Sequence, residues 1–139
     1  MSLECNGYTY SDYDLTGIHR AGYSEEALAL AQEDFESILY RAAHNEVAGL
    51  REAIVKGEID GSTYSGGSCR CLVGTIAKIR GCHYESMLNI RPDEHRPAEQ
   101  WFMSIVPGDD PDNSIISRIS LGWLDNWVAK QVAKQETNP

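Results

Sequence analysis

Apolar side chains recur at spacings of three and four residues along the C-terminal part of the chain. The series is Ile115, Ile116, Ile119, Trp123, Leu124, Trp127 and Val128. This is the period of one face of an α-helix, and Lys130 and Lys134 follow where the negative end of the helix dipole favours cations. The pattern predicts a long amphipathic helix that begins after the turn formed by residues 109–113.

Shorter stretches with the same period predict four further helices. These cover residues 24–43, about 45–57, 69–80 and 97–105. Ser24 and Asn45 are suitable N-caps for the first two, and Pro97 suits the first turn of the fourth. Gly57 and Gly81 are suitable ends for the second and third helices.

The order of these segments predicts a mainly α-helical single domain of about five helices. Residues 1–23, which are rich in Tyr, Gly and Asp, predict an irregular N-terminal arm or small hairpin, and residues 24–139 the helical domain. Residues 58–68, with Gly61 and Gly66, predict a long central loop. A chain of 139 residues is long enough to bury one self-sufficient core.

Acidic residues outnumber basic ones, with 21 Asp and Glu against 12 Lys and Arg and a formal net charge of -9. Nucleic-acid binding depends largely on basic side chains that release counterions, so we expect no direct binding to DNA or RNA. An acidic surface favours association with a basic surface on another protein. The candidate partner-binding residues are Glu25, Glu26, Glu33, Asp34, Glu36, Asp109, Asp110 and Asp112. The competing interpretation is that these carboxylates only keep the protein in solution.

The sequence also predicts a cytoplasmic protein without membrane association. No stretch approaches the roughly 20 apolar residues that a membrane span needs, and the first residues lack the pattern of a secretory signal. Cys69 and Cys71 are too close in sequence to form a standard disulfide with each other. We therefore expect reduced cysteines.

The residues best suited to reactive or metal-binding chemistry are Cys69, Cys71, Cys82 and His83. Thiolates and imidazole bind zinc, and a thiol such as that of Cys69 at a helix N-terminus could become a nucleophile. However, pairs in structural zinc sites are separated by about two to four residues, and no protease or amidase signature surrounds Cys69. The competing interpretation is buried, reduced cysteine, and we expect no metal, cofactor or catalytic residue.

Four blocks of sequence resemble a family of small uncharacterised proteins from bacteriophages and bacterial genomes. The blocks are IDGSTY at residues 59–64, CRCLVGTIA at 69–77, RPAEQWF at 96–102 and LGWLD at 121–125, within a family-like module of about residues 47–128. Some family members carry this module beside pentapeptide repeats, of which this chain has no obvious array. The resemblance brings no catalytic residues. It implies a small phage-type accessory protein, such as an inhibitor of a host defence complex of the anti-CRISPR kind.

Three functions remain as hypotheses. The first is a non-enzymatic, acidic protein that binds a basic surface on a host protein or complex. The second is a thiol-dependent enzyme or zinc-binding module centred on the Cys69, Cys71, Cys82 and His83 cluster. The third is a small homo-oligomerising module, in which aromatic helices pair with another copy. We expect Trp101, Trp123 and Trp127 in the core, with a partner surface as the alternative.

Overall fold

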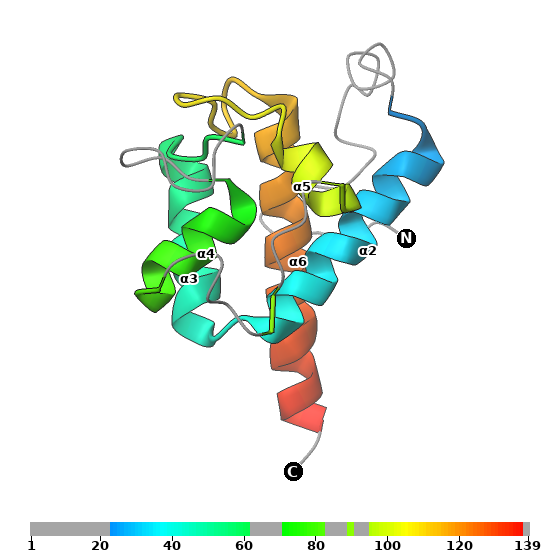
Figure 1. Ribbon diagram of the computed structural model, residues 1–139. Helices are drawn as coiled ribbons and strands as arrows, with labels where there is room; N and C mark the ends of the chain where they lie inside the picture. Colours follow the sequence, from blue (N-terminus) through cyan, green and yellow to red (C-terminus); the bar gives the residue numbers. More distant parts are fainter. Residues whose placement is uncertain (1–22, 62–70, 83–88, 91–94, 138–139) are drawn as a thin grey trace.

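The computed structural model describes residues 23–61, 71–82, 89–90 and 95–137, and these form five α-helices (Figure 1). The helices are α2 (Glu25–Arg41), α3 (His44–Lys56), α4 (Leu72–Arg80), α5 (Pro97–Phe102) and α6 (Ile115–Thr137). The described residues contain no strand, which confirms the prediction of a mainly α-helical chain of about five helices. The predicted N-terminal arm, apart from Tyr23, and most of the predicted central loop lie outside the described residues.

Local capping explains where most of the helices begin and end. The Ser24 hydroxyl accepts a hydrogen bond from the Ala27 backbone N–H at 3.1 Å, which starts α2 as predicted. Gly57 and Gly81 take left-handed conformations, with φ of 72° and 81°, and end α3 and α4 as predicted. Pro97 occupies the first turn of α5.

Four predicted boundaries are wrong by one to three residues, among them the start of the third helix, which is Leu72 instead of Cys69. The first helix ends at Arg41 instead of Ala43, because the chain is already extended at Ala42. The second begins at His44, because the Glu46 carboxylate accepts from the Ala43 backbone N–H at 2.9 Å and caps the helix there.

The fourth helix was expected to reach Ile105 but ends at Phe102. The Ile105 carbonyl accepts a hydrogen bond from the Gly61 backbone N–H at 2.9 Å, so it is paired with another segment. A second backbone bond joins the same two segments, from the Gly108 N–H to the Gly57 carbonyl at 2.9 Å. The chain after α5 therefore runs beside the segment after α3 instead of continuing as helix.

The principal helix contacts form a closed ring. Helix α6 packs on α2 and α3, α5 packs on α2 and α4, and α4 also packs on α3. Figure 1 shows α6 between α3 and α4 on the left and α2 on the right, with its C-terminal part continuing below them. Within the described residues, no helix is long and apolar enough to cross a membrane.

Aromatic rings fill the centre of this ring of helices. The Trp101 and Trp123 rings lie 4.9 Å apart between centroids, and Phe35 lies 5.4 Å from Phe102 and 6.3 Å from Trp123. The Trp101 indole N–H donates to the Ser120 hydroxyl at 2.8 Å, so its polar atom is paired inside the core. Trp101 and Trp123 are buried, which confirms their predicted place in the core, whereas Trp127 is half-buried and packs against the core.

Candidate functional site

A cysteine and a buried carboxyl meet at the N-terminus of α4. Helix α4 begins at Leu72, so Cys71 is its N-cap, and the Cys71 Sγ accepts a hydrogen bond from the Gly74 backbone N–H at 3.3 Å. Burial, and then the charge of the Glu99 carboxyl, raise the pKa of the Cys71 thiol far above its usual range. The thiol is therefore protonated at neutral pH, and it lacks the thiolate that a nucleophile requires.

The carboxyl beside Cys71 belongs to Glu99 on α5, whose residue is 2% exposed. Its Oε1 accepts a hydrogen bond from the Val73 backbone N–H at 3.0 Å, so a side chain of α5 caps α4. Burial raises the pKa of Glu99 to about 7, although the hydrogen bonds from Val73 and Cys71 act in the opposite direction. Glu99 thus changes charge near neutral pH inside the protein.

A second carboxylate, that of Asp34 on α2, caps α5 in the same way. It accepts from Arg96 Nε at 2.9 Å and Nη2 at 2.7 Å, and from the Ala98 backbone N–H at 3.0 Å. Burial alone would raise the pKa of Asp34, but the bonds from Arg96 and Ala98 and the Arg96 charge outweigh it and lower the pKa. Asp34 therefore stays ionised, and its two oxygens are occupied within the fold.

The cysteine–histidine cluster is separated by the length of α4. Cys82 follows the Gly81 cap, at the opposite end of the helix from Cys71. A helix of nine residues is about 14 Å long, so one metal ion could not bind both sulfur atoms. Cys69 and His83 lie outside the described residues. In the part of the chain that the structure describes, no group of three or more His, Cys, Asp or Glu is placed to hold a metal ion.

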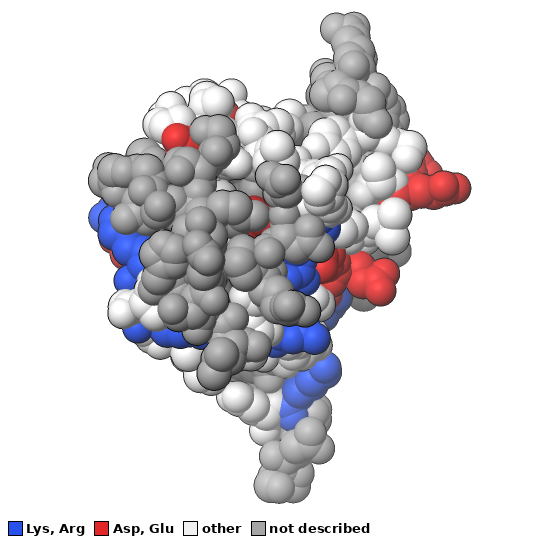
Figure 2. All heavy atoms as spheres, in the orientation of Figure 1, with Lys and Arg blue, Asp and Glu red and all other residues white. Residues whose placement is uncertain are grey.

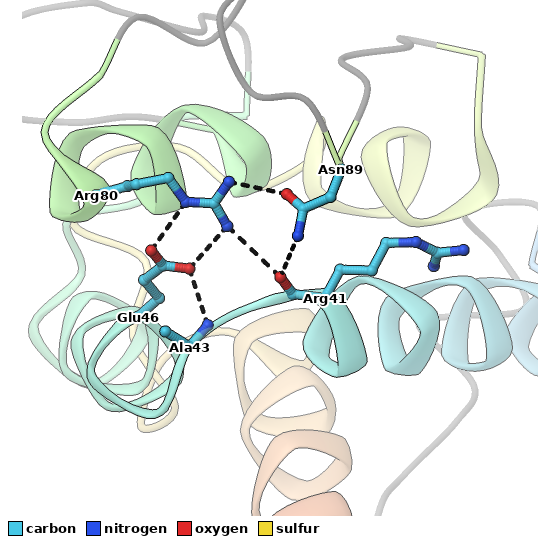
Figure 3. Close-up of polar contacts among 5 residues, drawn as sticks. All are labelled: Arg41, Ala43, Glu46, Arg80 and Asn89. Atoms are coloured by element: carbon cyan, nitrogen blue, oxygen red, sulfur yellow. Dashed lines mark hydrogen bonds and ion pairs between the residues drawn. The ribbon is translucent and has the colours of Figure 1, made fainter.

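A polar network joins the C-terminal end of α4 to the corner between α2 and α3 (Figure 3). Arg80 donates from Nε and Nη2 to the two Glu46 oxygens, each at 2.9 Å, and from Nη1 to Asn89 Oδ1 at 2.8 Å. Asn89 Nδ2 in turn donates to the Arg41 carbonyl at 2.8 Å. The Arg80 hydrogen bonds lower the pKa of Glu46, in spite of its burial. These bonds join three segments of the chain, so the network fixes the corner between α2, α3 and α4.

The acidic candidates on α2 divide into two groups. Asp34 faces α5. The other group is exposed or half-buried and consists of Glu25, Glu26, Glu33 and Glu36. Of these, Glu36 is half-buried, and its carboxylate accepts a hydrogen bond from Gln32 Nε2 at 3.1 Å. Figure 2 shows acidic side chains on the side of the molecule where α2 lies, and basic ones mainly elsewhere.

The acidic candidates between α5 and α6 shape a turn. Asp109 accepts from the Val106 backbone N–H at 3.1 Å, and Asp110 accepts from the backbone N–H groups of Asp112 and Asn113 at 2.8 and 3.1 Å. Asp109 and Asp110 are half-buried, whereas Asp112 is exposed. Two of these three carboxylates thus stabilise the backbone before α6.

Sequence reasoning did not single out Glu46 or Glu99 as important carboxylates. Glu46 could have been found, because it lies three residues after the N-cap Ala43, where a glutamate often caps a helix start. Glu99 has no comparable signal, because the N–H group that it caps lies 26 residues away.

No family model matches this chain, and neither a curated protein nor a solved structure gives a significant match.

Proposed function

We propose that this protein is a non-enzymatic binding protein that docks the outer face of α2 on a basic surface of another protein. The observation that carries the proposal is the position of Leu30, whose residue is 57% exposed. Glu26 and Glu33 lie one turn before and one turn after it, and both are exposed. A partner that docks on this helix face would therefore meet an apolar side chain between two carboxylates.

The outer face of α2 indicates the chemistry of its partner. An apolar side chain at the centre of an interface contributes most when polar groups surround it and exclude water. Here the surrounding groups are glutamates, so the partner would offer an apolar depression bordered by lysine or arginine. Tyr40, whose residue is 58% exposed, lies further along the same face and extends the surface towards α6.

The environment of Cys71 supports a binding function over a reaction at this thiol, because its burial opposes thiolate formation, while Cys69 lies outside the described residues. The family resemblance of the CRCLVGTIA and RPAEQWF blocks supports a more specific version. In that version the protein is phage-encoded and acts in the host cytoplasm, and the partner is a host defence complex, inhibited in the anti-CRISPR manner at a basic groove.

The experiment is a search for the partner followed by a charge reversal on α2. The purified protein serves as bait in host lysate at low and moderate salt, and mass spectrometry identifies what it retains. We then expect Glu33→Lys to weaken binding to the purified partner by at least about tenfold. The matched control is Glu58→Lys, an exposed site just after α3, because either variant changes the net charge from -9 to -7.

The salt dependence of binding and a substitution of Leu30 provide two further tests. Binding should weaken as the salt concentration rises, because exposed charges are screened. Leu30→Ala should also weaken binding, without a change in salt dependence. The proposal is wrong if Glu33→Lys and Glu58→Lys have the same effect on the affinity, since only the total charge would then matter.

A further inference from the structure

Helix α6 is much longer than the helices on which it packs. Its 23 residues span about 34 Å, whereas the 13 residues of α3 span about 20 Å. The first part of α6 is buried in the core, with Leu121 and Leu124 at 5% and 0% exposure. Its last turns continue below the other helices (Figure 1), where they have neighbours on fewer sides.

A groove of about 280 Å³ lies between α3 and this C-terminal half of α6. Val47 and Ala48 line it from α3, and Leu124, Val128 and Val132 line it from α6. Val128 is 36% exposed and Val132 is 48% exposed, so apolar surface remains in contact with solvent. Arg51 closes one edge with an ion pair, donating from Nε to Asp125 Oδ1 at 2.8 Å.

The α6 wall of the groove has the pattern of a helix–helix seam. Leu121, Leu124, Val128, Gln131 and Gln135 follow one another at spacings of three, four, three and four residues. This is the spacing of the a and d positions of a coiled coil. Leu121 and Leu124 are buried in the protein, and Leu124 lines the groove together with the last three residues.

The seam itself carries no formal charge. Neither Lys130 nor Lys134 lines the groove, and Lys134 is directed towards Tyr40 on α2, with its Nζ 5.8 Å from the centre of the tyrosine ring. Gln131 lines the groove and also donates from Nε2 to the Tyr40 hydroxyl at 3.3 Å. A helix laid along this seam would therefore meet valine and glutamine side chains, with His44, Trp127 and the Arg51–Asp125 ion pair in the walls of the groove.

We propose that the groove binds α6 of a second copy of this chain, with the two helices antiparallel. The spacing from Leu124 through Val128 and Gln131 to Gln135 is four, three and four residues, which reads the same in both directions. A twofold axis between Val128 and Gln131 therefore brings Gln135 of each copy to the end of the other copy's groove where the buried Leu124 lies. It also brings Val128 of each copy beside Gln131 of the other, so the same surface serves both partners.

The charge distribution also favours a second copy at this end. Two chains that each have a net charge of -9 repel each other, and this repulsion is weakest between regions that have few carboxylates. From Leu124 to Gln135, α6 has two lysines and one carboxylate, Asp125, which is already paired with Arg51. Figure 2 shows basic side chains towards the lower end of the molecule, where α6 projects, and the exposed acidic side chains of α2 lie away from it.

The expected dimer is weak, because specific interfaces bury about 800 Å² on each partner and three turns of one helix supply only part of that area. The full-length protein should be studied by sedimentation equilibrium at concentrations from about 10 µM to about 1 mM. We expect the mass to rise from the 15.5 kDa of one chain towards twice that value. The dimer should strengthen as NaCl is raised, because salt screens the repulsion between two acidic chains.

Substitutions of two valines that line the groove provide the decisive comparison. Val128→Glu and Val132→Glu should each weaken the dimer by at least about tenfold, because each places a new carboxylate in the interface on both copies. The matched control is Val106→Glu, which adds the same charge at a residue that is 53% exposed in the loop after α5. Far-UV circular dichroism establishes that each variant is folded. Val132 lines the groove beside the seam and is the more exposed of the two valines, so Val132→Glu decides the question if Val128→Glu unfolds.

Three results would overturn the proposal. The wild-type protein could remain at 15.5 kDa up to about 1 mM in high salt, which would leave no dimer to explain. A dimer could form but tolerate both Val128→Glu and Val132→Glu, which would place its interface elsewhere. Salt could dissociate the dimer, which would indicate pairing between opposite charges. None of these results bears on the α2 surface, whose binding to a basic partner should weaken with salt.

Discussion

Replacing Glu99 by Gln should stabilise the protein at pH 8 and leave its stability at pH 4 nearly unchanged. The pKa of Glu99 is about 7 in the folded protein and 4.5 in its ordinary state. A carboxyl with a raised pKa stabilises the fold below pH 4.5, and this contribution is lost as the pH rises through about 7. Glutamine stays neutral at every pH, and its amide oxygen can accept the hydrogen bond from Val73.

The magnitude follows from the difference between the two pKa values. About 2.5 pH units, at about 1.36 kcal/mol each, correspond to about 3 kcal/mol. Glu99 is 2% exposed, so solvent screening does not reduce this figure greatly. The charges that face it are those of Arg96, which lowers its pKa, and Asp34, which raises it. Both remain in the variant, so their own titration largely cancels in the comparison.

Urea unfolding of the wild type and of Glu99→Gln, followed by circular dichroism between pH 4 and pH 8, measures this difference. The free energy of unfolding of the variant should exceed that of the wild type by about 3 kcal/mol at pH 8. Glu33→Gln is the control, because it removes the same charge from an exposed position on α2. A stability difference that is independent of pH, or a variant that is less stable at pH 8, would refute the account of Glu99 as a buried acid.

Two further substitutions test the packing and the polar corner. A Cβ on Gly61 would overlap the Phe102 carbonyl oxygen. Gly61→Ala should therefore lower the free energy of unfolding by about 2 kcal/mol or more. An unchanged thermal melting curve would contradict this close approach of the two segments. Arg80→Ala should cost about 2–3 kcal/mol at pH 7, because it leaves the Glu46 carboxylate, 6% exposed, without its cation. This loss of stability should be smaller in acid, where the Glu46 carboxylate, whose pKa is lowered in the wild type, becomes protonated. An equal loss at pH 7 and at pH 3 would argue against the ion pair.

The helices were predictable because their determinants are local. Apolar spacing identified α2 and α6, and single residues such as Ser24 and Gly57 marked helix ends through their own side chain or backbone conformation. The predicted start of α4, Cys69, is three residues too early. Its first turn depends on the carboxyl of Glu99 in another helix, and a pattern along the chain carries no information about that partner.

A pattern along the chain also gives no reason to distinguish one acidic residue of α2 from another. Asp34 and Glu33 are adjacent in sequence and carry the same charge, but they lie on different sides of α2. Asp34 binds Arg96, 62 residues away, and Glu33 is exposed. Helical spacing indicates which side of α2 is apolar, but it does not show that a second short helix covers one of the polar positions.

The two carboxylate caps have a consequence for the order in which the fold opens. Helices of six and nine residues are too short to be stable alone, so α5 and α4 depend on their neighbours. Asp34 on α2 holds α5, and Glu99 on α5 holds α4. Release of α5 therefore frees the N-terminus of α4 as well. The amide hydrogens of the first turn of α4 should exchange with solvent no more slowly than those of α5, while those of α2 remain protected.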